Sequence, residues 1–79
     1  RMIRTDKYKM IIYPRANIVR LYDIQKDPHE INDLAGNKKY RKIMDKLFKR
    51  FQELQQEIKD PLDVRPYYNA FMTNNESSI

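Results

Sequence analysis

The amino-acid sequence predicts a small α+β fold, in which an antiparallel sheet of three to four strands packs against one long C-terminal helix. Runs rich in β-branched and aromatic residues fill much of residues 1–24, as is typical of strands. Apolar residues recur at spacings of three and four between residues 40 and 58, as on one face of a helix. The connections between the strand-like runs are too short for parallel crossovers, so we expect antiparallel strands.

Turn-forming residues set the limits of the strands. Asp6-Lys7 reads as a two-residue turn, although it lacks the glycine that the favoured hairpin turns contain. Pro14 has no backbone N–H to donate, so it ends the second strand. We expect the strands at about residues 2–5, 8–13 and 18–24.

The second and third strands carry apolar residues on both faces. In the second strand, alternation places Tyr8, Met10 and Ile12 on one face and Lys9, Ile11 and Tyr13 on the other. In the third strand it separates Val19 and Leu21 from Ile18 and Tyr22. A sheet with one solvated face would alternate cleanly between apolar and polar residues. The long helix covers one face, so we expect the other to dock onto a missing domain or another chain.

Residues 21–36 read as a strand that leads into a short helix over residues 28–35. Asp27 is placed to cap the helix, Pro28 suits its first position, and Glu30 can reach back to the cap. Gly36 can adopt the left-handed conformation that closes a helix.

The long helix is expected over residues 38–59, with Asn37 as its cap and Pro61 just after its end. Its apolar stripe consists of Tyr40, Ile43, Met44, Leu47, Phe48, Phe51, Leu54 and Ile58. The segment that follows is apolar enough to pack, in an extended form, as far as residue 72. Residues 73–79 are polar and are expected to be disordered. Residues 1–72 therefore form one small domain, and a chain of this length buries only about 60–65% of its unfolded surface.

Composition excludes several classes of site. The chain has no cysteine, so it has neither disulfides nor thiolate metal ligands, and one histidine cannot form a histidine-rich metal site. One glycine excludes glycine-rich phosphate loops. No apolar run is long enough to span a membrane, and no signal peptide is recognisable. The sequence starts Arg1-Met2 within a strand-like pattern, which predicts a fragment of a longer polypeptide.

Each candidate site has a simpler explanation in the fold. His29 fits solvation at a helix start better than a catalytic or ligand role. Calcium loops need alternating oxygen ligands around a central glycine, and the nearby acids lack that spacing, so capping is favoured. These acids are Asp23, Asp27, Glu30 and Asp33. No nucleophile has a base placed beside it, so the chain alone is not catalytic and no catalytic, metal or cofactor residue is assigned.

The positive charge of the chain raises the question of nucleic acid. The net charge is +5, with lysine and arginine concentrated in residues 1–20 and 38–59. Tyrosines could stack bases beside these cations, although tyrosines in strands usually pack through their rings. The tyrosines concerned are Tyr8, Tyr13, Tyr22, Tyr67 and Tyr68, and the cations are Arg4, Lys9 and Arg20. A solvated helix face and polar strand ends explain the charge more simply, so we expect no nucleic acid.

Three motifs in order resemble the C-terminal subdomain of sulfatases, the sulfuric ester hydrolases of the alkaline-phosphatase-like superfamily. They read R-T-D-K-Y-K-M-I at residues 4–11, L-Y-D-I at 21–24 and K-D-P-H-E-I-N-D-L-A-G at 26–36. The family pattern is R-T-x-K-Y-K, then L-Y-D-L, then D-P-x-E-x-x-N-L-A. Asp33 stands where asparagine is commoner, and His29 where glycine is frequent. The resemblance covers about residues 2–60.

The resemblance implies a four-stranded antiparallel sheet that is packed by a C-terminal helix and docked on a large α/β catalytic domain. The fourth strand would come from upstream of Arg1 or from the C-terminal tail. That domain would explain the second apolar face and would hold the calcium and the formylglycine, which forms in a Cys/Ser-x-Pro-x-Arg motif that this sequence lacks. The subdomain would help shape the pocket for a sulfate ester, with Arg1 and the tail as candidate contacts. Family members are mostly periplasmic, lysosomal or secreted. The alternative is a free-standing basic module that binds nucleic acid or protein.

Overall fold

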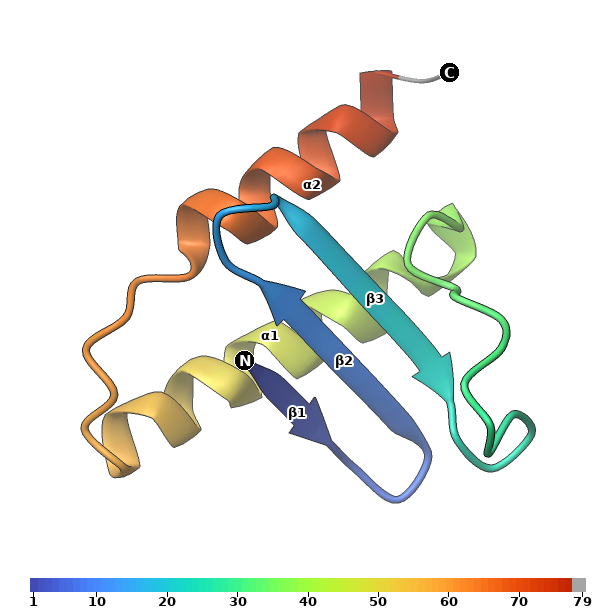
Figure 1. Ribbon diagram of the computed structural model, residues 1–79, viewed down its shortest axis with the longest axis horizontal. Coiled ribbons are helices and arrows are strands. Elements are labelled where there is room, and N and C mark those ends of the chain that lie inside the picture. Colours follow the sequence, from blue (N-terminus) through green and yellow to red (C-terminus); the bar gives the residue numbers. More distant parts are fainter. Residues whose placement is uncertain (78–79) are drawn as a thin grey trace.

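A computed structural model describes residues 1–77, and the side chains of residues 1–74. Its elements are β1 (Met2–Arg4), β2 (Tyr8–Tyr13), β3 (Ile18–Asp23), the short 3₁₀ helix η1 (Lys38–Tyr40), α1 (Arg41–Glu57) and α2 (Arg65–Ser77). Within the described residues the strands form one antiparallel sheet in the order β1-β2-β3 (Figure 1). The α+β class, the antiparallel sheet and the long helix are confirmed.

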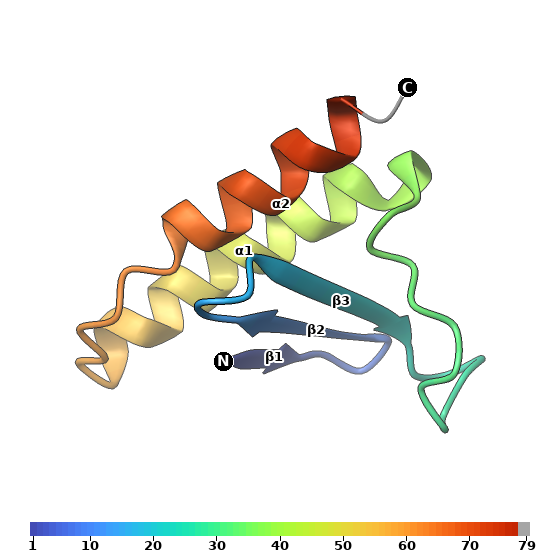
Figure 2. The ribbon, with the colours of Figure 1, turned by 45° about the horizontal axis from the view of Figure 1, so that its top comes forward.

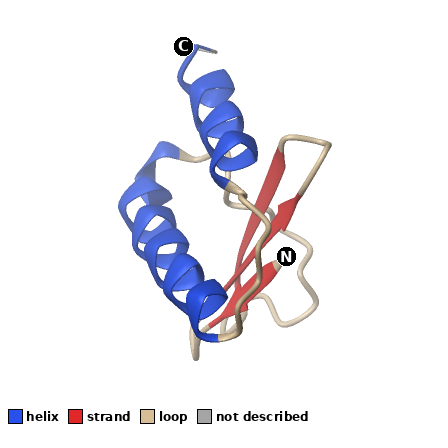
Figure 3. Ribbon diagram, turned by 90° about the vertical axis from the view of Figure 1, so that its left-hand side faces the viewer, coloured by secondary structure: helices blue, strands red, loops and turns tan. Residues whose placement is uncertain are grey.

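Both helices lie on the same face of the sheet (Figure 3). The register places Met10 beside Ile3 and Leu21, and Ile12 beside Val19, so that their side chains share the face toward the helices. The core between the sheet and the helices comprises Ile3, Met10, Ile12, Val19, Leu21, Ala35, Met44, Leu47, Phe48, Phe51, Val64 and Tyr68. The predicted division of β2 and β3 into two faces is therefore correct.

The β1–β2 turn needs no glycine because none of its residues has positive φ, and Thr5 fastens it with hydrogen bonds. Its hydroxyl oxygen accepts from the backbone N–H of Lys7 and of Tyr8, and the N–H of Thr5 donates to the Tyr8 carbonyl. In the β2–β3 loop, Arg15 and Asn17 take left-handed backbone angles, with φ of 74° and 53°. This conformation is tolerated by asparagine and is unusual for arginine.

The long helix starts as predicted. The Asn37 side chain accepts from the N–H of Lys39 and caps η1, which continues into α1. The buried face of α1 follows the predicted stripe except at its C-terminal end, where Ile58 is 73% exposed and the polar Gln55 is buried. Gln55 tolerates burial because its amide donates to Asp60 and to the Leu62 carbonyl.

The predicted helix over residues 28–35 is absent, and this prediction was wrong. Asp27 does accept backbone N–H groups, but they belong to Ile31 and Asn32 and fasten a loop. Glu30 is left-handed, with φ of 56°, and no glycine has positive φ, so Gly36 does not close a helix. A helix here would need buried apolar contacts, whereas Ile31 is 77% exposed.

The C-terminal segment is also not the predicted extended chain. It forms α2, which lies across β2 and β3 (Figure 2). The predicted disorder is therefore wrong for residues 73–77, while residues 78–79 lie outside the described part of the chain. Asp63 accepts from the N–H of Arg65 at the helix start, and Pro66 follows in the first turn. Because these residues form a helix, they do not supply a fourth strand.

Candidate functional site

The sheet face that points away from the helices, called the outer face, is partly apolar and uncovered. Pairing of the strands places Met2, Arg4, Lys9, Ile11, Tyr13, Ile18, Arg20 and Tyr22 on it. At one end, Met2 is 52%, Tyr13 41% and Ile18 40% exposed. Together with the partly exposed Ile11, these residues form the apolar patch. No chain segment among the described residues buries this patch.

The other end of the outer face is covered by the loop between β3 and η1. Tyr22 is buried there, and Glu30 from the loop pairs with Lys9, their charged atoms 3.0 Å apart. The free edge of β3 is also closed, because Leu21 donates its N–H to Asp33 and accepts from the N–H of Leu34. Since part of the sheet is already covered, the apolar patch and the neighbouring exposed Arg4 and Arg20 are what remains of the described outer face for an external partner.

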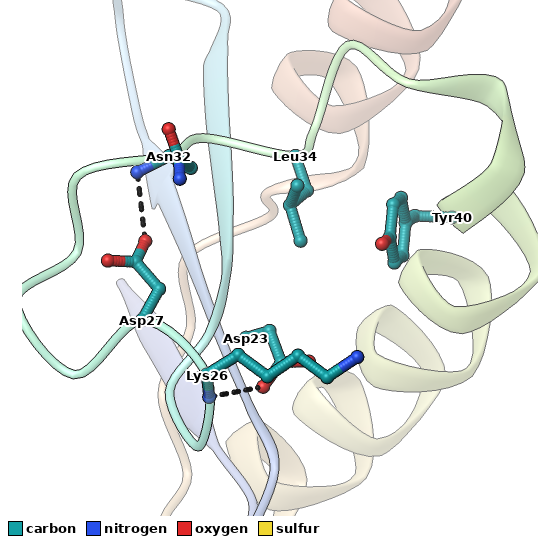
Figure 4. A pocket seen from close by; sticks show the side chains of 6 residues that line it. All are labelled: Asp23, Lys26, Asp27, Asn32, Leu34 and Tyr40. Carbon is teal, nitrogen blue, oxygen red and sulfur yellow. Dashed lines mark hydrogen bonds between the residues drawn. The ribbon is translucent and has the colours of Figure 1, made fainter.

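The same loop forms a small pocket of about 190 Å³ (Figure 4). The pocket is lined by Asp23, Lys26, Asp27, Asn32, Leu34 and Tyr40. Its two carboxylates are engaged by the backbone: Asp23 accepts from the N–H of Gln25 and Lys26, and Asp27 from those of Ile31 and Asn32. These acids therefore fasten the loop.

The backbone contacts of Asp27 make the loop sensitive to acid. The N–H groups of Ile31 and Asn32 lower the pKa of Asp27 below its usual value of 3.8. The stabilisation that these bonds give is thus complete above pH 3.8 and disappears as the pH falls through the lower pKa of the folded state. We expect the amide NMR signals of Ile31 and Asn32 to shift together in that acidic range. Asp27→Asn should remove the shift, and an unchanged titration in that variant would contradict this role.

The acids considered as a calcium cluster serve separate purposes. Asp23 and Asp27 hold loop amides, Glu30 pairs with Lys9, and Asp33 pairs with Arg20 at 3.7 Å. Across the described residues, no group of three or more histidine, cysteine or acidic side chains is arranged to hold a metal ion. His29 is exposed on the same loop. The structure therefore brings none of these residues together as ligands.

The tyrosines do not assemble into a platform for bases. Tyr13 and Tyr22 lie on the outer face, Tyr8 lies on the face toward the helices, and Tyr67 and Tyr68 lie on α2. Tyr22 and Tyr68 are buried. Two cations do lie over rings, Arg20 at 6.0 Å from the ring centre of Tyr13 and Lys7 at 5.6 Å from that of Tyr8. These contacts are on opposite faces of the sheet.

Arg1, a candidate contact for an anionic substrate, is engaged within the chain. Its guanidinium group pairs with the Asp60 carboxylate at 2.8 Å. Asp60 also accepts from the N–H of Leu62 and the amide of Gln55, and these bonds keep its pKa below the usual value. The cluster ties the start of β1 to the link between α1 and α2. Sequence reasoning did not find it, because its members are far apart in the chain.

A second cluster missed by sequence reasoning joins the two helices. The Tyr68 ring stacks on Phe48 with centres 4.0 Å apart, and the Tyr68 hydroxyl donates to Asp45 at 2.8 Å. Burial, followed by the bond to the Asp45 carboxylate, raises the pKa of Tyr68. The sequence offered one signal, the Asp63 and Pro66 pair at the start of α2, which is typical of a helix N-terminus.

Among the described residues, no helix is both long enough and apolar enough to cross a membrane.

Comparison with known proteins agrees with the motifs. The family described as "N-sulphoglucosamine sulphohydrolase, C-terminal" matches residues 1–57. Two curated proteins of Bacteroides thetaiotaomicron are similar. A Delta 4,5-hexuronate-2-O-sulfatase is 46% identical over 44 residues, which is 56% of this chain and 9% of the relative. An N-acetylglucosamine-6-O-sulfatase is 34% identical over 59 residues, which is 73% of this chain and 11% of the relative.

The chain thus spans about a tenth of the length of these relatives. No solved structure gives a significant match. The family match covers β1, β2, β3, the loop and α1, which are the elements that build the sheet and its main helix. On this evidence, the chain belongs to the sulfatase family of N-sulphoglucosamine sulphohydrolase C-terminal domains.

Proposed function

We propose that this domain packs, through the apolar patch of its outer face, on the catalytic α/β domain of a sulfatase and helps shape the pocket in which a sulfate ester is hydrolysed. The observation that carries the proposal is the patch itself. Met2, Ile11, Tyr13 and Ile18 lie side by side on an otherwise completed small fold, with the helices packed on the opposite face.

Domain docking accounts for this arrangement physically. Each large apolar side chain that becomes fully buried contributes about 1.5–3 kcal/mol relative to the exposed state. Beside the patch, Arg20 and its partner Asp33 place an exposed ion pair at the border. A border of this kind is typical of an interface with an apolar centre and a polar rim. The chain's membership of a sulfatase C-terminal family supplies the partner, which is the catalytic domain of the same kind of enzyme.

The catalytic chemistry would reside in that partner domain. The Cys/Ser-x-Pro-x-Arg motif that yields formylglycine does not occur in this sequence. The four acids considered for a calcium site, Asp23, Asp27, Glu30 and Asp33, are held by backbone N–H groups or paired with cations, so they do not fit such a site. This domain would therefore contribute position and shape, while calcium and formylglycine would act from the catalytic domain. A free-standing module that binds nucleic acid has no observation in its favour.

The proposal predicts that Ile18→Ser weakens the docking of this domain on the catalytic domain in the complete natural polypeptide that contains this chain. Because Ile18 is 40% exposed in this domain, burying that remaining part at the domain interface should contribute about 1 kcal/mol of docking free energy, and Ile18→Ser should lose it. We expect a lower midpoint of thermal unfolding and a lower rate of sulfate release from a sulfated sugar.

Ile31→Ser is the matched control, because Ile31 is a strongly exposed isoleucine on the loop, away from the patch. It should change both measurements little. Equal effects of the two substitutions, or no effect of Ile18→Ser, would contradict docking through the apolar patch.

A further inference from the structure

The solvent side of η1 and α1 carries a row of lysines, called the lysine stripe, which consists of Lys39 in η1 and of Lys42, Lys46 and Lys49 in α1. All four side chains are exposed. Their spacing of three, four and three residues places them along one side of the helix, opposite the buried Met44, Leu47 and Phe51. At a rise of about 1.5 Å per residue, the row extends for about 15 Å.

The positive charge of the stripe is not neutralised within the described side chains. No carboxylate of residues 1–74 forms an ion pair with any of the four lysines. Asp45 is near Lys42 and Lys49 in sequence, but it accepts the Tyr68 hydroxyl on another side of the helix. Further along α1 the pattern differs, because Arg50 pairs with both Glu53 and Glu57.

Helix stability does not explain this distribution of charge. A helix favours acids near its N-terminus and cations near its C-terminus, because of the direction of its dipole. In η1 and α1 the first turn has no acid, the lysines occupy the N-terminal half, and Glu53 and Glu57 occupy the C-terminal half. The lysines also repel one another. The arrangement lowers the stability of the free helix, so a bound anion is the simplest way to offset it.

We propose that the lysine stripe binds a sulfated polysaccharide, as a second site remote from the reaction. The inference rests on the proposed function, since two similar proteins are named as sulfatases of sugar units. The row of unpaired cations matches a linear polyanion. The aromatic residues of α1, Phe48 and Phe51, are buried in the core, so the stripe has no exposed ring of this helix on which a nucleobase could stack.

The position of the stripe makes it compatible with domain docking. The outer face and α1 lie on opposite sides of the sheet (Figure 3). If the apolar patch contacts the catalytic domain, the lysine stripe faces outward and remains accessible. A long substrate could then be held at the stripe while another part of the same chain occupies the reaction site.

The test measures binding of the complete natural polypeptide to heparin, as a model sulfated polysaccharide, over a range of salt concentrations. The stripe variant is Lys42→Gln/Lys46→Gln/Lys49→Gln, in which glutamine preserves helix propensity. The control variant is Arg15→Gln/Lys26→Gln/Lys59→Gln, which removes the same amount of charge from exposed positions elsewhere.

The slope of log affinity against log salt is negative, and each lost cation contact should reduce its magnitude by about 0.7–0.9, on the scale known for nucleic acids. We therefore expect the magnitude of the slope to fall by about 2–3 in the stripe variant and by less than about 1 in the control. At physiological salt the stripe variant should bind about tenfold or more weakly.

Three results would overturn the proposal. Equal losses in the two variants would mean that the net charge alone attracts heparin. No loss in the stripe variant would mean that heparin binds elsewhere. Binding of single-stranded oligothymidine as tightly as heparin, with the same dependence on the stripe, would assign the site to nucleic acid. Binding of heparin and of oligothymidine is measured without catalysis and without changing Ile18. A failure of the proposed lysine-stripe site is therefore distinguishable from a failure of domain docking.

Discussion

Phe48→Ala should lower the free energy of unfolding by about 3–5 kcal/mol, the usual cost of truncating a buried phenylalanine. Phe48 lies in the core, and its ring is stacked on Tyr68 of α2. The substitution leaves a cavity and removes the ring contact between α1 and α2. Urea unfolding measures the loss, and hydrogen exchange should show that the amides of α2 lose more protection than those of β2.

Tyr68→Phe separates the two parts of this contact. It keeps the stacked ring and removes only the hydrogen bond from the hydroxyl to Asp45. A hydrogen bond to a charged partner contributes about 1.5–3 kcal/mol, so the expected loss is smaller than for Phe48→Ala. If Phe48→Ala cost less than about 1 kcal/mol, α2 would not be anchored as the structure describes.

Leu47→Ala should cost about 2–5 kcal/mol, because Leu47 is buried between α1 and the sheet. Ile58→Ala on the same stretch of chain is the matched control. Ile58 fits the predicted stripe but is exposed in the structure, so its truncation should change the free energy of unfolding by less than about 0.5 kcal/mol. Chemical denaturation compares the two. Equal costs would show that the helix packs through a different face.

The sheet and α1 were predictable because their signals are periodic. Met10, Ile12, Val19 and Leu21 alternate with residues of the other face, and that alternation divided each of the two strands into two faces. The extent of α1 followed from its apolar spacing and from the cap at Asn37. These signals are contained in short stretches of sequence, so they can be recognised without knowledge of the rest of the fold.

The two errors have tertiary causes. Asp27 and Pro28 suit a helix start, but Asp27 equally suits a loop in which one carboxylate accepts two amides, and no burial of Ile31 favours the helix. In α2, by contrast, the local helix signal is weak and the tertiary contacts favour the helix. Its polar C-terminal part has little periodicity, and its packing depends on the stack of Tyr68 on Phe48, which are twenty residues apart in the chain.

The functional surfaces were only partly predictable. A second apolar face was expected from the sequence, and the outer face carries its exposed residues Met2, Tyr13 and Ile18. The sequence did not indicate that the loop would bury Tyr22 and restrict the open area to one end of the sheet. That coverage depends on the pair of Lys9 and Glu30, which are far apart in sequence.

The central claim, that the apolar patch docks on a catalytic domain, is tested most directly by oxidation of methionine in the complete natural polypeptide. Hydroxyl-radical footprinting with mass spectrometry gives the rate at each methionine, and that rate follows exposure to solvent. Met2 belongs to the patch, whereas Met10 and Met44 are fully buried in the core and serve as internal references. Docking predicts that Met2 is oxidised as slowly as Met10 and Met44. Rapid oxidation of Met2, at a rate expected for its 52% exposure in this domain, would contradict the claim.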